Sequence, residues 1–143
     1  MTIPLVDKVV ETRIGMIRNE LSEFFPEASI EATTDKDGRA VIRMTQERWV
    51  IGMEFVETDS SWNDPKRFRD YYIALVNKCR LGVIVPKDNA MSARLKLLEF
   101  NQRWLFYYQV FSYDDDGNLR KIGRPHDDDG TKRGPVTTLP GYL

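Results

Sequence analysis

The sequence from Arg48 to Pro86 reads RWVIGMEFVE, TDSSWNDP, KRFRDYYIALVNKCRL and GVIVP, and it is the most informative part of the chain. Its four parts are an apolar strand with one interior glutamate, a loop, an amphipathic basic helix and a short apolar strand. A short, continuous apolar strand that follows a helix is typical of a parallel strand buried on both faces. The stretch therefore predicts a strand–helix–strand unit within a mixed sheet.

The first strand of this stretch, Arg48–Glu57, is predicted to lie at the centre of the sheet because it is apolar on both faces. Alternation of side chains assigns its residues to two sides. One side holds Trp49, Ile51, Met53 and Phe55, and the other holds Val50, Gly52, Glu54 and Val56. Glu54 is then a buried carboxylate, which needs a cation, a metal ion or water as its partner.

The helix that follows is predicted to begin at Asp64 and Pro65, because Asp caps helix N-termini and Pro fits the first turn. Gly82 is predicted to end this helix, which places Cys79 inside it. The strand after the helix is predicted at Val83–Val85.

Upstream, apolar residues recur at helical spacing from Leu5 to Phe25, and Pro26 ends the predicted helix. Strands are predicted at Ser29–Thr34 and Arg39–Thr45, joined by a hairpin turn at Asp37-Gly38. The charged residues of the helix are expected to be mostly solvated, namely Glu11, Arg13, Arg18, Glu20 and Glu23.

Downstream, a helix is predicted from Asp88 or Asn89 to about Arg103, and a hairpin follows it with strands at Leu105–Tyr113 and Leu119–Ile122. The run at 104–108 is very apolar, so it is either buried on both sides or part of a subunit interface. The element order predicts a three-stranded meander followed by one right-handed crossover. Residues 1–123 are read as a single α/β domain and residues 124–143 as an irregular tail.

Composition excludes several classes of protein. The 143 residues are 41% apolar with a net charge of −1, which fits one folded domain and does not indicate a strongly basic nucleic-acid binder. The single cysteine excludes a disulfide framework, and the single histidine, His126, argues against Ser-His-Asp and Cys-His mechanisms. With no long apolar run and no apolar signal core, the chain is predicted to be cytoplasmic without a membrane partner.

The order α-β-β-β-α-β over Leu5–Pro86 resembles the core of the restriction-endonuclease-like, or PD-(D/E)xK, nuclease superfamily. The resemblance implies that core, with an added helix and a C-terminal β-hairpin. It also implies a metal site with an acid at the start of the second strand, an acid-x-Lys pair on the third and often a glutamate from the first helix. Such a site uses Mg²⁺ to hydrolyse phosphodiesters.

Carried over to this sequence, the resemblance makes Glu54 the third-strand acid and metal ligand, with Asp37 and Glu20 as the other catalytic candidates. Val56 stands at the position of the lysine. Each acid also has a structural interpretation. Asp37 fits a turn, Glu20 fits a solvated helix position, and Glu54 fits an ion pair with Arg43. The cation of the missing lysine would come from one of three residues, Lys78, Arg80 or Arg43.

The basic helix suggests contacts to nucleic acid, because its cations could bind phosphates and nearby aromatic residues could stack on bases. The cations are Lys66, Arg67, Arg69, Lys78 and Arg80, and the aromatic residues are Trp62, Tyr71 and Tyr72. The structural interpretation of the same residues is a solvated helix face and core packing.

Two hypotheses follow from the sequence. In the first, the chain binds nucleic acid and carries a degenerate Mg²⁺-dependent phosphodiesterase site around Glu54. In the second, it is a non-catalytic protein-interaction module and a homodimer. The surroundings of Glu54 separate the two.

Overall fold

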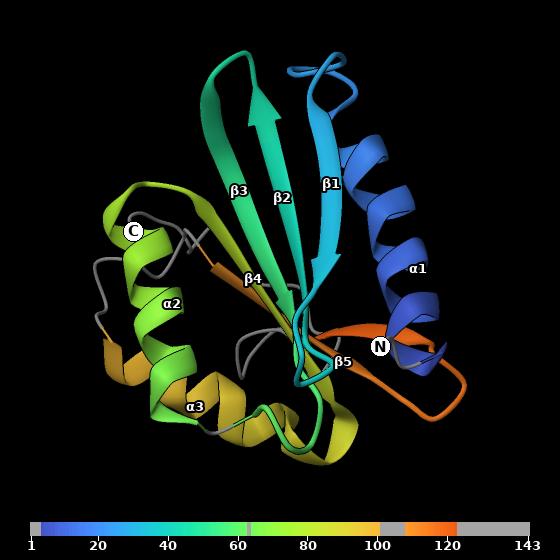
Figure 1. Cartoon of the computed structure of the whole chain (residues 1–143), viewed down its shortest axis with the longest axis vertical. Helices are drawn as coiled ribbons and strands as arrows, with labels where there is room; N and C mark the ends of the chain where they lie inside the picture. Colours follow the sequence, from blue (N-terminus) through green and yellow to red (C-terminus); the bar gives the residue numbers. More distant parts are fainter. Residues whose placement is uncertain (1–3, 63, 101–107, 123–143) are drawn as a thin grey trace, which may run out of the picture.

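A computed structural model of the chain describes residues 4–62, 64–100 and 108–122. In these ranges a six-stranded mixed sheet, ordered β1-β2-β3-β4-β5-β6, lies between α1 on one face and α2 with α3 on the other (Figure 1). The elements are α1 (Pro4–Leu21), β1 (Ser29–Thr34), β2 (Ala40–Gln46), β3 (Trp49–Val56), α2 (Pro65–Val76), β4 (Arg80–Pro86), the 3₁₀ turn η1 (Lys87–Asn89), α3 (Ala90–Phe100), β5 (Tyr108–Tyr113) and β6 (Leu119–Ile122).

The strand pairing confirms the predicted meander and the predicted crossover. Strands β1, β2 and β3 pair antiparallel, and β3 pairs parallel with β4 across α2. Strand β5 is also parallel to β4, so α3 forms a second parallel connection that the sequence did not predict. Strands β5 and β6 form the predicted antiparallel hairpin. The hairpin pattern in the sequence does not indicate that β5 also pairs with β4, so this connection was not predicted. The α/β class with a mixed sheet is confirmed.

Two apolar cores hold the three layers together. On the α1 face, Val9 and Ile17 pack with Ile84 of β4. On the opposite face, Leu75 of α2 and Leu97 of α3 pack against the residues of β4 that alternate with Ile84. Strand β4 is thus buried on both faces, which explains its continuous apolar sequence.

Helix α2 begins as predicted and ends earlier than predicted. The Asp64 side chain accepts a hydrogen bond from the backbone N–H of Lys66, and Pro65 occupies the first turn. The helix ends at Val76, because Lys78 adopts a left-handed conformation with φ of 64° that a helix cannot continue through. Cys79 is therefore buried beyond the helix, and Gly82 lies inside β4.

A β-bulge changes the predicted alternation along β3. Met44 pairs with Gly52 and Thr45 pairs with Val50, so Ile51 is an extra residue between the two pairs. Ile51 consequently packs against the core on the α1 face, whereas Met53 packs on the opposite face. The prediction that these two side chains share one side of the sheet is wrong.

The remaining bounds differ by a few residues or fall outside the described part. Helix α1 ends at Leu21 rather than at Phe25, while β1 and β6 have their predicted bounds. The expected helix end at Arg103, the run at 104–107, His126 and the tail at 124–143 lie outside the described residues. In the part of the chain that is described, no helix is long and apolar enough to cross a membrane.

Candidate functional site

Two acidic residues, Glu54 in β3 and Glu57 directly after it, are buried on opposite faces of the sheet. Glu54 points toward α1 and is 4% exposed, while Glu57 lies on the side of α2 and is fully buried. Removing a carboxylate from water is costly unless a cation and hydrogen bonds compensate for the loss of hydration. Each of the two glutamates meets this requirement with a different buried arginine.

On the α1 face, the partner of Glu54 is Arg13. Arg13 Nε donates to Glu54 Oε1 at 2.6 Å, and Arg13 Nη2 donates to Glu54 Oε2 at 2.7 Å. This is the two-pronged geometry in which a guanidinium matches a carboxylate. The Arg13 side chain is fully buried and its guanidinium lies 4.4 Å from the centre of the Phe111 ring.

The same guanidinium also holds Glu20. Arg13 Nη1 donates to Glu20 Oε2 at 2.8 Å, and Arg80 lies 3.3 Å from the other oxygen of Glu20. Burial acts to lower the pKa of Arg13, but hydrogen bonds to Glu54 and Glu20 and their negative charges outweigh burial, so this pKa is raised. Burial acts to raise the pKa of Glu20, whereas Arg13 and Arg80 lower it, and the net result is a lowered pKa.

Gly82 of β4 leaves the space that Glu54 occupies. Glu54 and Gly82 are neighbours in the parallel ladder between β3 and β4. A Cβ atom on Gly82 would lie 2.5 Å from Cδ of Glu54, which is closer than atoms can approach without displacement. The glycine inside this otherwise apolar strand is thus explained by the buried ion pair.

On the opposite face, three side chains bind the carboxylate of Glu57 and a fourth binds its backbone oxygen. Arg39 Nε donates to Glu57 Oε2 at 3.0 Å, and the Tyr71 hydroxyl donates to the same oxygen. The Ser61 hydroxyl donates to Glu57 Oε1 at 2.7 Å, and the Tyr113 hydroxyl donates to the backbone oxygen of Glu57 at 2.7 Å. This network joins β3, α2 and β5 near the ends of the parallel strands.

Arg39 extends the second network toward the surface. Its Nη1 donates to Asp70 at 2.8 Å, and its guanidinium lies 4.3 Å from the centre of the Phe55 ring. Burial acts to lower the pKa of Arg39, but the charges of Glu57 and Asp70 raise it overall. Arg39 Nη2 is buried without a hydrogen-bond partner among the described residues.

The structure brings two of the three catalytic candidates together. Glu54 and Glu20 meet at the guanidinium of Arg13, as a site formed by the first helix and the third strand requires. Asp37 is not part of this cluster, because it lies in the turn between β1 and β2 and pairs with Arg67 of α2. The carboxylates expected to form one site are thus divided between two places.

Two of the three cations expected near Glu54, Arg43 and Arg80, do not pair with it. Ile42 is the residue opposite Glu54 in the ladder, so the neighbouring Arg43 points to the other face of the sheet. Arg80 binds Glu20 instead of Glu54. The predicted ion pair of Glu54 with Arg43 is therefore wrong, although an ion pair is present.

Sequence reasoning missed Arg13, which was expected to be solvated and is fully buried. A usable signal was present. Arg13 lies four residues after Val9 and four before Ile17, so it belongs to the apolar stripe of α1. A charge within such a stripe indicates a buried partner of opposite charge.

The donor set around Glu54 does not suit Mg²⁺. Both oxygens of Glu54 and both oxygens of Glu20 already face arginine nitrogens. Among the described residues, no group of three or more His, Cys, Asp or Glu side chains could hold a metal ion. The catalytic roles of Glu54, Glu20 and Asp37 stay predictions.

The proposed nucleic-acid contacts are dispersed. Arg67 is mostly buried and paired with Asp35 and Asp37, and Arg80 is paired with Glu20. The three other cations of the basic segment are exposed, namely Lys66, Arg69 and Lys78. Of the three aromatic residues, Trp62 and Tyr71 are buried and only Tyr72 is half exposed, so two of them belong to the core instead of a stacking surface. Binding of nucleic acid through these residues stays a prediction.

Comparison with known proteins adds no relative. No model of a protein family matches the sequence. Neither the curated proteins nor the solved structures that were compared match it. Conclusions about function therefore depend on the contacts described above.

The close approach of Gly82 and Glu54 leads to a first prediction. Gly82→Ala should lower the free energy of unfolding by about 2–4 kcal/mol, because the new Cβ displaces Glu54 from Arg13. Gly15→Ala is the matched control, since Gly15 lies in α1 with nothing within 4 Å of its added Cβ. The control should raise stability by about 0.5–1 kcal/mol. Urea unfolding measures both, and equal effects would contradict the account of Gly82.

The buried tyrosines lead to a second prediction. Burial, Asp59 and Glu57 raise the pKa of Tyr113 from 10.0 to about 12. Burial, followed by the charge of Glu57 and its hydrogen bond, also raises the pKa of Tyr71. A raised pKa in the folded state means that stability is fully present below about pH 10. It is lost as the pH rises through the folded pKa values.

Urea unfolding across this alkaline range should show a loss of about 1–2 kcal/mol attributable to Tyr113 alone. Tyr113→Phe should make the decline shallower, because it removes one of the titrating groups. Tyr72→Phe, at a half-exposed position of α2, should leave the decline unchanged. Stability that stays constant up to pH 12 would contradict the two hydroxyl contacts to Glu57.

Proposed function

We propose that this chain is a non-catalytic interaction module built on a restriction-endonuclease-like core. In this proposal the guanidinium of Arg13 takes the place between the helix acid Glu20 and the strand acid Glu54 that a metal ion takes in an active nuclease. The observation that carries the proposal is the two-pronged, fully buried contact of Arg13 with Glu54.

The energetics of Arg13 support this proposal. A metal ion that binds Glu54 must displace a guanidinium that is fully buried and packed over Phe111. Leaving a buried charge without its partner costs about 3–5 kcal/mol. Metal binding would have to supply this free energy in addition to the cost of dehydrating the ion.

The other positions of the expected site support the proposal as well. Val56, at the position of the lysine, is fully buried in the apolar core on the α1 face. The residues of β2 that point to this face are Ala40, Ile42 and Met44, and all three belong to the same core. The position of the lysine and the β2 positions on this face therefore offer no polar group. Among the described residues, the carboxylates that bind Arg13 are those of Glu54 and Glu20.

The scaffold part of the proposal has separate support. Three antiparallel strands, a helix and a fourth strand parallel to the third follow α1 in the order that the resemblance requires. An acid of the first helix and an acid of the third strand bind the same guanidinium, which matches the pair of acids that the resemblance implies. In this proposal the fold is retained, and the cation between the two acids has changed from a metal ion to an arginine.

The proposal predicts that the chain cleaves neither DNA nor RNA. Labelled single-stranded and double-stranded substrates are incubated with Mg²⁺ or Mn²⁺, and calorimetry measures Mn²⁺ binding to the same protein. We expect no cleavage and no Mn²⁺ binding that depends on Glu54. Metal-dependent cleavage that is lost in Glu54→Gln and retained in Glu31→Gln, an exposed position of β1, would overturn the proposal.

The same substrates test the alternative hypothesis of nucleic-acid binding. If Lys66, Arg69 and Lys78 contact phosphates, the logarithm of the affinity falls with the logarithm of the salt concentration. Replacing these three residues by Gln should then reduce the slope of that dependence. Binding with such a slope, in the absence of cleavage, would favour a nucleic-acid partner over a protein partner.

A further inference from the structure

In the part of the chain that the structure describes, strand β1 is one edge of the sheet, and the backbone groups on its outer side pair with no other strand. The backbone N–H of Asp35 donates to the oxygen of Arg39 at 2.8 Å, which makes these two opposite residues a hydrogen-bonded pair. Hydrogen-bonded and non-hydrogen-bonded pairs alternate along an antiparallel ladder. Ile30, Ala32 and Thr34 therefore direct their N–H and C=O groups away from β2.

This edge lacks the features that usually block pairing with another strand. Strand β1 contains no proline and no lysine, and five of its six residues are exposed. Its one charge, Glu31, lies opposite Arg43 in the ladder, so a cation is available to offset it. The other edge, β6, is shorter and carries exposed Arg120 and Lys121, which protect it.

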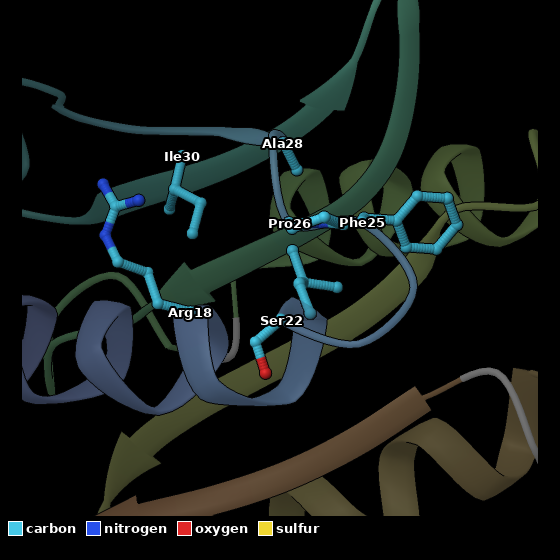
Figure 2. Close-up of a pocket in the computed structure, with 7 residues that line it drawn as sticks. Arg18, Ser22, Phe25, Pro26, Ala28 and Ile30 are labelled. Carbon is cyan, nitrogen blue, oxygen red and sulfur yellow. The ribbon is translucent and has the colours of Figure 1, made fainter.

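A pocket lies beside the start of β1. Figure 2 shows Arg18 on α1 and Ser22 directly after the end of α1, with Ile30 of β1 and Ala28 across the pocket from them. Leu21, Phe25 and Pro26 complete its lining. Ile30 also belongs to the residues whose backbone groups face outward, so the pocket and the free edge are continuous.

The pocket has an apolar floor and one cation. Arg18 is exposed and makes no ion pair with any residue in the described part of the chain. It differs in this respect from Arg13, Arg39 and Arg67, which are all paired with carboxylates. Phe25, in the pocket, is 39% exposed, and its neighbour Phe24 is 75% exposed, which adds apolar surface next to Arg18.

We propose that this place binds an extended peptide segment of another protein as an added strand on β1. Main-chain hydrogen bonds would form with Ile30, Ala32 and Thr34, and an aliphatic side chain would enter the pocket. An adjacent carboxylate of the peptide would pair with Arg18. This inference rests on the proposed function as an interaction module and names the class of its partner.

Charge favours a peptide over a second copy of the chain. In an antiparallel pair of β1 strands related by a two-fold axis normal to the sheet, both copies place α1 on the same face. The second β1 then presents Ile30, Ala32 and Thr34 toward the pocket and keeps Glu31 on the other face. Such a pair supplies no carboxylate from β1 for Arg18 and brings a second Arg18 to the same face.

The test starts with selection of a phage-displayed library of random twelve-residue peptides on the immobilised full chain. One enriched peptide is then synthesised and its affinity is measured by fluorescence anisotropy. We expect enriched peptides to share an aliphatic residue with Asp or Glu within two positions of it. Arg18→Glu should remove the acidic preference, whereas Arg18→Lys should retain it.

Backbone pairing is tested at Ala32. Ala32→Pro removes one outward N–H group and should weaken binding about tenfold, while Ala32→Val keeps this group and should bind like the wild type. If Ala32→Pro unfolds, the peptide is instead N-methylated at alternate amides, which removes hydrogen bonds without any change in the protein. The methylated peptide should bind at least tenfold more weakly.

Three results would overturn the inference. They are the absence of an enriched peptide, an unchanged affinity after removal of the Ala32 N–H or of the peptide amides, and a dimer in analytical ultracentrifugation that Ala32→Pro abolishes. The last result would assign the edge to a second copy. None of these variants alters Arg13 or Glu54, so the cleavage assay judges the proposed function separately. A protein that cleaves nothing and binds no peptide contradicts this inference alone.

Discussion

Two carboxylates are buried at the central strand β3, Glu54 within it and Glu57 directly after it, and each needs a buried cation. Glu54 binds Arg13 and thereby ties α1 to one face of the sheet. Glu57 binds Arg39 and Tyr71, which tie β2 and α2 to the other face. Buried ion pairs of this kind add little net stability compared with apolar side chains, but breaking one is costly. Their main effect here is to fix how the layers sit on β3.

The same interaction limits the chemistry available to the chain. Both oxygens of Glu54 accept a hydrogen bond from the buried guanidinium of Arg13, so a metal ion at Glu54 would compete with a cation that is already bound. Arg13 also neutralises part of the charge of Glu20, so the two acids share one permanent cation. We therefore propose that the helix and strand acids are structural, and that the edge of β1 and the pocket beside it are accessible features of the described part of the chain.

Much of the fold could be predicted from the sequence, because its signals are local. The Asp-Gly turn, the cap at Asp64 and the apolar segments located most helices and strands to within a few residues. The signals that failed were not local. The second parallel connection depends on which strand β5 pairs with. Gly82 was predicted to end a helix, because the sequence does not show that the Glu54 side chain fills the space beside this glycine. The partner of Glu54 lies 41 positions earlier in the chain, on another element.

A double-mutant cycle measures how strongly Arg13 and Glu54 depend on each other. Free energies of unfolding are measured for the wild type, Arg13→Leu, Glu54→Leu and the double variant. We expect each single change to cost about 3–5 kcal/mol and the double change to cost at least about 2 kcal/mol less than their sum. The pair of Lys96 and Glu99 on the surface of α3 lies outside this network, serves as the control and should show little coupling. Additivity within about 0.5 kcal/mol at Arg13 and Glu54 would contradict the account.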